Sequence, residues 1–192
     1  MQHVNLMDEK GDRISIFAHY PSHEFEVDVE SIRPAAAAAD IISVTIMDYC
    51  RQYLPMLDEL GAPVWIDIHD WDGANPYHQE FIEAADFLFM SSPLLPDWRE
   101  FLESRIEAGA HACVATHGAA GASGITATEG WKEVKAVPAI DIVDTNGAGD
   151  AFFAGFSKAW TEGAVLGEAM EAGANQAARA VASLGLAPMV GK

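Results

Sequence analysis

The stretch IVDTNGAGDAFFAGF, residues 142–156, places two aspartates around a segment with almost no side chains. Asp144 and Asp150 flank Thr-Asn-Gly-Ala-Gly, and an apolar run of small and aromatic residues follows. Two glycines around Ala148 allow a tight turn, and a helix from about Asp150 adds unpaired N–H groups and the positive end of its dipole. The stretch therefore predicts an anion site built from main chain, with no need for lysine.

Asp150 lies at the edge of this predicted site. Its carboxylate can accept a proton from an attacking hydroxyl, while the adjacent amides stabilise charge on a transferring phosphoryl group. Asp is also a favoured helix N-cap, so GAGD alone leaves a purely structural role equally open. A GxxxxGK(S/T) phosphate loop is excluded because no Lys follows the last glycine, and an EF-hand loop because Ala148 stands at its fifth position.

Strand-like and helix-like segments alternate along the 192 residues. The pattern predicts a hairpin at residues 4–7 and 13–19 with a turn at 9–12. Further strands are expected at 41–46, 64–68, 86–90, 112–116 and 131–137, and helices at 49–60, 76–85, 98–108, 150–160 and 166–184. Apolar strands between helices predict an α/β fold with a mostly parallel sheet and helices on both faces. Ligand sites are then expected after VWIDI (64–68), ACVAT (112–116) and IDIVD (140–144).

The composition narrows the possible partners. The formal charge is −18, from 11 Lys and Arg against 29 Asp and Glu. Without a basic cluster, such a field argues against a nucleic-acid partner. No apolar run reaches the roughly 18 residues of a membrane span, and the polar start does not read as a signal peptide. With Cys50 and Cys113 in apolar runs, we expect reduced thiols in a cytoplasmic protein without a membrane partner.

The longer string DTNGAGDAFFAGF resembles the C-terminal signature of the ribokinase-like sugar and nucleoside kinases, the PfkB family. The resemblance continues upstream through ACVATHGAAG with its TxGxxG pattern, VWIDI with its aspartate, and MDEKGDRISIF as a lid hairpin. AGANQAARAVASLGLAP is similar to the family's closing helix and loop. The resemblance implies a ribokinase-like nucleotide-binding core at residues 31–192 and a remnant of the lid at residues 1–30.

The resemblance also implies a function: an ATP-dependent kinase acting on a hydroxyl of a sugar, sugar acid or nucleoside, with Mg²⁺ and, in many members, K⁺. Asp150 would be the general base, and the amides of Gly147, Ala148 and Gly149 would hold the γ-phosphate. The other residues that the resemblance implies are Thr116, Gly118, Gly121 and Asn175 around the nucleotide, Thr145 in the turn, and Asp144 with the carbonyl of Asn146 and the loop around Gly185 at the monovalent cation.

Three departures from the family pattern bear on this function. The match covers roughly the C-terminal three-fifths of family members and lacks their Gly-Gly-Asn sugar-binding segment, which predicts a fragment, a homo-oligomer or a partner that covers the exposed sheet. The NxxE motif that positions Mg²⁺ is replaced by SSPL at residues 91–94, and Met189 stands where a small polar residue often closes the cation loop. A non-catalytic remnant that binds nucleotide or a partner protein therefore remains an alternative.

Three features outside the signature have competing interpretations. His117 is expected to be an exposed loop histidine, with a nucleotide contact as the alternative. Asp67, His69, Asp70 and Asp72 lack the ligand spacing of a metal site, and the resemblance favours Asp67 as a buried polar residue beside the nucleotide. Ser123 is expected in a loop, because GASG does not match a GxSxG nucleophile elbow.

Overall fold

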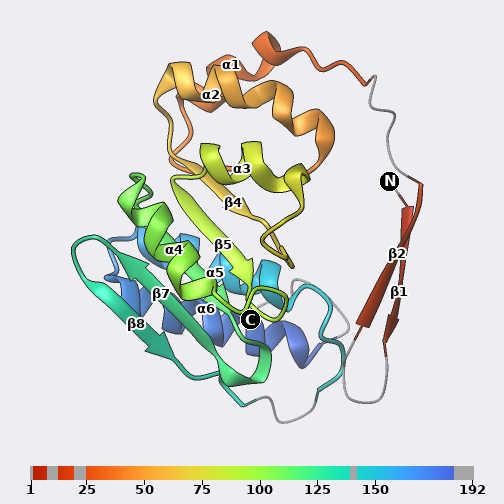
Figure 1. Cartoon of the computed structure of the whole chain (residues 1–192), viewed down its shortest axis with the longest axis vertical. Helices are drawn as coiled ribbons and strands as arrows, with labels where there is room; N and C mark the ends of the chain where they lie inside the picture. Colours follow the sequence, from red (N-terminus) through yellow and green to blue (C-terminus); the bar gives the residue numbers. More distant parts are fainter. Residues whose placement is uncertain (1, 8–12, 20–24, 139–141, 184–192) are drawn as a thin grey trace, which may run out of the picture.

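The computed structural model describes residues 2–7, 13–19, 25–138 and 142–183. Strands β1 (Gln2–Met7) and β2 (Arg13–His19) form an antiparallel hairpin, which Figure 1 shows beside the main body of the molecule. The predicted turn at residues 9–12, the loop around Gly185 and Met189 lie outside the described residues. No helix in the described ranges is both long and apolar enough to cross a bilayer.

The main sheet has six strands in the order β3-β4-β5-β6-β7-β8. The strands β3 (Ile42–Ser43), β4 (Val64–Asp67), β5 (Phe87–Ser91) and β6 (Ala112–Thr116) are parallel, and β7 (Ala122–Thr126) and β8 (Gly130–Val134) are antiparallel additions. The prediction of a mostly parallel α/β sheet is confirmed. The predicted loop at Ser123 is wrong, because this residue lies in β7, where every residue is buried and small residues fit between neighbouring elements.

Helices cover the sheet on both faces, as predicted. Alternate residues of the central strands face α2 (Leu54–Leu60), α3 (Gln79–Ala84) and α4 (Trp98–Glu107) on one side, and α5 (Ala148–Thr161) and α6 (Leu166–Val181) on the other. Helix α1 (Val29–Ala37) packs against α2, outside this layer. This arrangement gives one hydrophobic core on each face of the sheet. In β5, for example, Leu88 belongs to the core on the side of α2, α3 and α4, and Phe89 belongs to the core on the side of α5 and α6. This alternation gives each strand end one residue directed to each side.

The predicted helices at 49–60 and 76–85 are each divided in two. The 3-10 turn η1 (Asp48–Tyr53) precedes α2, and η2 (Pro76–His78) precedes α3. Pro55 occupies the second position of α2 and has no N–H to continue an α-helical ladder from η1. Helix α2 ends at Gly61, in the left-handed conformation, as the sequence predicts.

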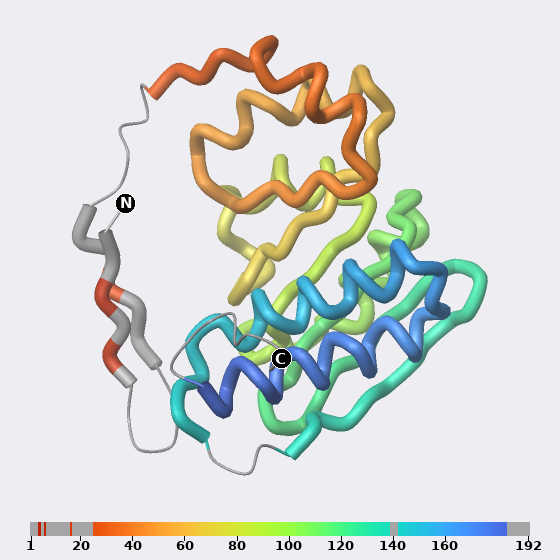
Figure 2. The backbone as a smooth tube through the Cα atoms, turned by 180° about the vertical axis from the view of Figure 1, so that it is seen from behind, coloured from red at the N-terminus to blue at the C-terminus, as the bar shows by residue number. Residues whose placement is uncertain are grey.

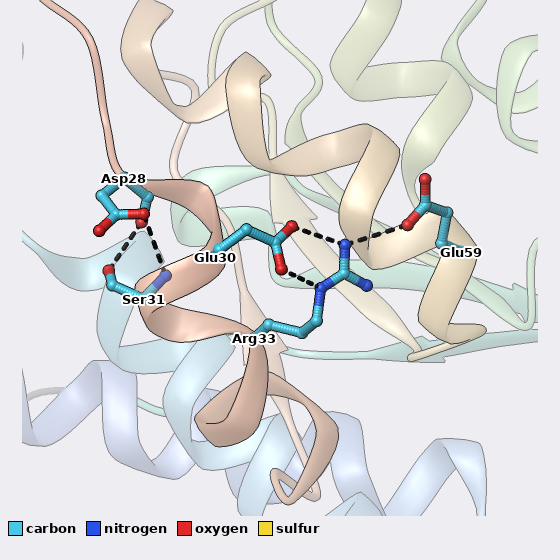
Figure 3. A network of polar contacts seen from close by, with 5 residues as sticks. All are labelled: Asp28, Glu30, Ser31, Arg33 and Glu59. Carbon is cyan, nitrogen blue, oxygen red and sulfur yellow. Dashed lines mark hydrogen bonds and ion pairs between the residues drawn. The ribbon is translucent and has the colours of Figure 1, made fainter.

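Helix α1 contains no buried residue, and polar contacts hold it in place (Figure 3). Asp28 caps it by accepting from the amide of Ser31 at 3.3 Å. Arg33 donates to Glu30 at 2.7 Å and to Glu59 of α2 at 3.1 Å, so one guanidinium joins the two helices (Figure 3). The chain before α1 is attached as well, because the side-chain amide Nε2 of Gln52 donates to the carbonyl of Phe25 at 2.8 Å.

Helices α5 and α6 lie side by side on the sheet and approach very closely (Figure 2). A Cβ on Gly155 would lie 2.8 Å from the carbonyl oxygen of Ala172, and a Cβ on Gly173 would lie 2.8 Å from that of Phe152. Both glycines are therefore needed for contact between the two backbones.

Replacing Gly173 with Ala should destabilise the fold by roughly 1–3 kcal/mol, because the new methyl group cannot fit without separating α5 from α6. The matched control is Gly167→Ala on the same helix, where nothing lies within 4 Å of the new Cβ. There we expect up to about 1 kcal/mol of stabilisation from helix propensity. Denaturant unfolding measures both, and equal effects of the two substitutions would contradict the close packing.

Candidate active site

Helix α5 begins two residues earlier than the sequence predicts. Gly147 is its N-cap in the left-handed conformation with φ 74°, and Ala148 is its first residue. Asp150 is thus the third residue of the helix, and the interpretation of Asp150 as a simple N-cap is wrong. The preceding turn is closed from within: the amide of Asn146 donates to Oδ1 of Asp144 at 2.8 Å.

The first turn of α5 presents main-chain donors. Within the described part of the chain, the N–H groups of Gly149 and Asp150 have no acceptor, and both residues are exposed. The amide of Ala148, by contrast, donates to the carbonyl of Thr145 at 3.3 Å. Two free amides at the positive end of a 14-residue helix make a site that favours an anion.

Three polar residues end the central strands on the face that carries α5. Asp67, Ser91 and Thr116 each follow, two positions later, a residue of the core that packs on α5 and α6. Ser91 and Thr116 are directly paired between β5 and β6, and Thr116 Oγ1 donates to the carbonyl of Met90 at 3.3 Å. The carboxyl ends of the strands therefore face the N-terminus of α5, which Figure 1 shows beyond the arrowhead of β5.

Asp67 is the side chain that links the sheet to this helix terminus. A Cβ on Gly149 would lie 3.9 Å from Asp67 Oδ2. The side chain is 20% exposed, which agrees with the expectation of a largely buried polar residue. Its Oδ1 accepts from the amide of His69 at 2.8 Å, and His69 Nδ1 lies 3.6 Å from Oδ2. Burial raises the pKa of Asp67, and the nearby carboxylates of Asp150 and Asp70 raise it further, against the effect of His69.

Replacing Asp67 with Asn should remove a loss of folding stability that grows as pH rises. Because the pKa of Asp67 is raised in the folded state, the folded protein keeps this proton at pH values where the unfolded chain, with a pKa of about 3.9, has lost it. The free energy of unfolding should therefore fall as pH rises from about 4 through the raised pKa. Asp67→Asn should lack this fall and be the more stable protein at pH 7, with no difference near pH 3.

Unfolding in denaturant at several pH values measures this effect, and Asp72→Asn is the control. Backbone N–H groups of Ala74 and Asn75 lower the pKa of Asp72, so its charge favours the folded state and its stabilisation is lost as pH falls. Asp72→Asn should not be more stable than the wild type at pH 7. Parallel pH profiles for the wild type and Asp67→Asn would contradict a raised pKa of the buried Asp67 carboxyl.

The TxGxxG turn follows β6 and uses its glycines for different reasons. Gly118 has φ 57° and nothing lies within 4 Å of a Cβ added there, whereas Gly121 has φ 106° and its Cβ would lie 2.0 Å from the carbonyl oxygen of Val134. Gly118 is exposed and Gly121 is buried. Gly121 is therefore required where the turn passes the end of β8, independently of any ligand.

Gly121→Ala should destabilise the protein by several times as much as Gly118→Ala. The first substitution places a methyl group on a backbone carbonyl, and the second costs roughly 1–2 kcal/mol for a left-handed alanine. Thermal unfolding of the two variants gives the comparison. If Gly118→Ala were the more damaging variant, the contact with β8 would not be what requires the glycine.

His117 is not the exposed loop histidine that the sequence predicts. Its Nδ1 lies 2.6 Å from Ser92 Oγ and its Nε2 lies 3.0 Å from Ser123 Oγ, and its ring packs against Trp98 at 4.7 Å between centroids. Sequence reasoning missed both serines as partners. The sequence presents Ser92 only as part of the substituted NxxE segment, and Ser123 only as a loop residue.

The remaining predicted residues lie in different surroundings. Asn175 is exposed on α6, and its amide donates to the carbonyl of Glu171 at 2.8 Å; no contact among the described residues joins it to the start of α5. Residues 142–144 of IDIVD do not belong to the sheet, so the expected strand end is wrong there. Instead, the amides of Val143 and Asp144 donate to the carbonyl of Val181 at 2.9 and 3.2 Å, so the last turn of α6 positions this segment.

The described residues contain no group of three or more His, Cys, Asp or Glu side chains placed to hold a metal ion. What the arrangement offers is a pair of carboxylates, Asp67 and Asp150, on either side of free main-chain amides. Carboxylate oxygens are hard ligands of the kind that Mg²⁺ takes together with substrate phosphates and water.

A mostly parallel sheet whose strand ends face the free N-terminus of a helix is the architecture of a phosphate- or nucleotide-binding α/β protein. A family model described as pfkB family carbohydrate kinase matches residues 6–190, and the chain belongs to this family. The predicted resemblance is therefore confirmed.

Individual relatives agree with this assignment. The acarbose 7(IV)-phosphotransferase of Actinoplanes sp. is 34% identical over 159 residues, which are 80% of this chain and 52% of that protein. The fructoselysine 6-kinase of Shigella flexneri is 30% identical over 147 residues, which are 76% of this chain and 55% of that protein. The solved structure of the microbiome-derived acarbose kinase Mak1 has a TM-score of 0.85 at 29% identity, covering 97% of this chain and 64% of that one. The chain thus spans about half the length of the two kinases compared by sequence and 64% of the solved structure.

Proposed function

We propose that this chain carries the nucleotide-binding and phosphoryl-transfer part of an ATP-dependent kinase that acts on a hydroxyl group. The observation that carries the proposal is the pair of free amides, Gly149 and Asp150, beside the carboxylates of Asp67 and Asp150. An anion site next to a base is what transfer from a triphosphate to an alcohol requires.

In this proposal Asp150 accepts the proton of the acceptor hydroxyl. The oxygen then attacks the γ-phosphorus, the bond from that phosphorus to the β–γ bridging oxygen breaks, and ADP leaves. The free main-chain amides of Gly149 and Asp150, presented by the turn at Gly147 and Ala148, stabilise the charge on the transferring group. Asp150 suits the role because it is exposed and is not used to cap the helix.

The other family positions keep the roles that their place in the chain suggests. Thr116 and Gly118 line the nucleotide from the end of β6, Gly121 shapes their turn, and the exposed Asn175 contacts the base or ribose. In the segment before α5, Thr145 fixes the turn, and Asp144 and the carbonyl of Asn146 hold a monovalent cation such as K⁺.

The charges of the site are compatible with Mg²⁺. Asp67, Asp150 and a triphosphate repel one another, and among the described residues Asp67 has no Lys or Arg partner and only His69 within ion-pair distance. Asp67 and Asp150 would hold a divalent cation such as Mg²⁺, which would offset this repulsion and supply charge neutralisation to the phosphates. Asp67 then takes the part that the absent Asn and Glu of residues 91–94 leave open.

The acceptor is proposed to be a sugar, a sugar acid or a nucleoside, and the names of the relatives favour a hydroxyl on a sugar-containing compound. Residues 1–30 act as a lid on the core formed by residues 31–192. Val4 and Leu6 of β1 and Ile16 of β2 are about half exposed and share one face, since Val4 pairs with Ile16. This apolar face supports a second chain of the same protein or another partner against the hairpin.

The test is ATP binding by calorimetry with Mg²⁺ and K⁺, on the wild type, Gly149→Val and Asp150→Asn. Gly149→Val should abolish binding, because its side chain fills the space before the free amides and approaches Asp67. Asp150→Asn should still bind ATP but lose phosphorylation of any accepted sugar by roughly 10²–10⁴-fold.

Two outcomes would overturn parts of the proposal. Unchanged ATP binding by Gly149→Val would place the phosphate elsewhere. A folded wild-type chain that binds no ATP would favour the alternative of a non-catalytic protein that binds a partner, consistent with its coverage of only half of its relatives.

A further inference from the structure

His117 joins three segments at the carboxyl end of the sheet. Its ring is half-buried beside Trp98 of α4, and each ring nitrogen meets a serine hydroxyl, Ser92 at 2.6 Å and Ser123 at 3.0 Å. Ser92 follows β5, His117 follows β6 and Ser123 belongs to β7. The imidazole therefore spans both neighbours of its own strand.

The ring lies on the side of the sheet opposite the anion site. Thr116 ends β6 on the face of α5, and the next residue, His117, is directed to the face of α4. At the end of β5, Ser91 likewise faces α5 and Ser92 faces α4. With both nitrogens occupied on this far side, the imidazole has no free donor or acceptor for a nucleotide at α5.

Main-chain bonds at the same place show what the ring supports. The amide of Ser92 donates to the carbonyl of Thr116 at 3.0 Å, which extends the pairing of β5 and β6. The amide of His117 donates to the carbonyl of Gly121 at 2.8 Å and closes the turn that contains Gly118. Loss of the ring contacts would remove the side-chain link between the two segments and leave these main-chain bonds less well supported.

The surroundings of His117 favour the neutral imidazole. Burial lowers the pKa of His117 and Arg99 of α4 lowers it further, while Glu133 of β8 opposes the shift. A neutral imidazole donates from one nitrogen and accepts at the other, and each serine hydroxyl can take the complementary role. Both hydrogen bonds are therefore satisfied at once in either tautomer.

We propose that His117 is a positioning residue: through Ser92 and Ser123 it holds the turn at residues 117–121 and the segment after β5 in place, and it does not touch the nucleotide. The consequence for ATP rests on the proposed function, because that turn is the one expected to line the nucleotide. The positioning itself does not depend on a ligand.

The first experiment measures ATP affinity by calorimetry for the wild type, His117→Leu, Ser92→Ala, Ser123→Ala and the double variant His117→Leu with Ser92→Ala. We expect each serine variant to weaken ATP binding by roughly 2–10-fold and His117→Leu by about tenfold or more, from the usual worth of one and two hydrogen bonds. The double variant should bind no more weakly than His117→Leu alone, since both changes break the same contact.

The opposite pattern overturns the proposal. If the serine variants bind ATP as the wild type does while His117→Leu alone is weakened, the imidazole contacts the nucleotide itself. His111→Gln is the matched control, because His111 stands at the other end of β6, is exposed, and should not affect ATP binding.

The second experiment uses no nucleotide. In His117→Leu, hydrogen exchange of the amides of Ser92 and His117 should be faster than in the wild type. In each serine variant, exchange should be faster in the segment whose contact with the imidazole is lost. The amide of Ile68, which donates to the carbonyl of Phe89 at 2.9 Å, should exchange at an unchanged rate in all variants. Unchanged exchange at Ser92 and His117 would overturn the positioning role. A wild type that binds no ATP but shows the faster exchange in its variants would reject the proposed kinase and keep the role of His117.

Discussion

The position of helix α5 is the constraint on which the site depends. Phe156 of α5 packs against Phe89 of the sheet at 5.1 Å between ring centroids, which fixes the helix on one face. Gly155 and Gly173 allow the backbone of α6 to pack directly against α5 on a second side. Packing on the sheet and on α6 anchors α5. The N–H groups of its first turn are therefore not needed to hold the helix and can remain without an acceptor. The left-handed Gly147 then brings the chain into α5 without a side chain that would fill the space before those amides.

The electrostatics of the site follow from placing acidic groups at that terminus. A helix N-terminus alone attracts anions, whereas Asp67 and Asp150 oppose them, and burial increases the cost of the charge on Asp67. The two effects are balanced only when a cation enters with the anion. In the proposed kinase, a chain with a formal charge of −18 would therefore favour a metal–phosphate complex over a bare phosphate at this site. The same reasoning would account for a phosphate site without lysine in that kinase.

The sequence predicted much of the regular secondary structure. Apolar runs such as ACVAT predicted β6 with its observed bounds, and Gly61 marked the end of α2. It failed where one residue changes the local hydrogen bonding: Pro55 divides a predicted helix, and the small residues around Ser123 conceal β7. For the site, DTNGAGD predicted donors at Gly147, Ala148 and Gly149, whereas the free N–H groups among the described residues are those of Gly149 and Asp150. The place of Asp67 beside Gly149 and the contacts of His117 are long-range and could not be predicted. Nothing in the spacing along the chain indicates that Ser92 and Ser123 flank one imidazole 25 and 6 residues away.

The alternation of faces at the ends of β5 and β6 also limits how this protein can vary. Ser91 and Thr116 face α5, while the next residues, Ser92 and His117, face α4. Inserting or deleting a single residue within either strand would exchange the two sets, turning the hydroxyls away from the anion site and the imidazole toward it. Related chains should therefore tolerate changes of residue type in these strands more readily than changes of length. Variation in length should be confined to exposed connections outside these strands.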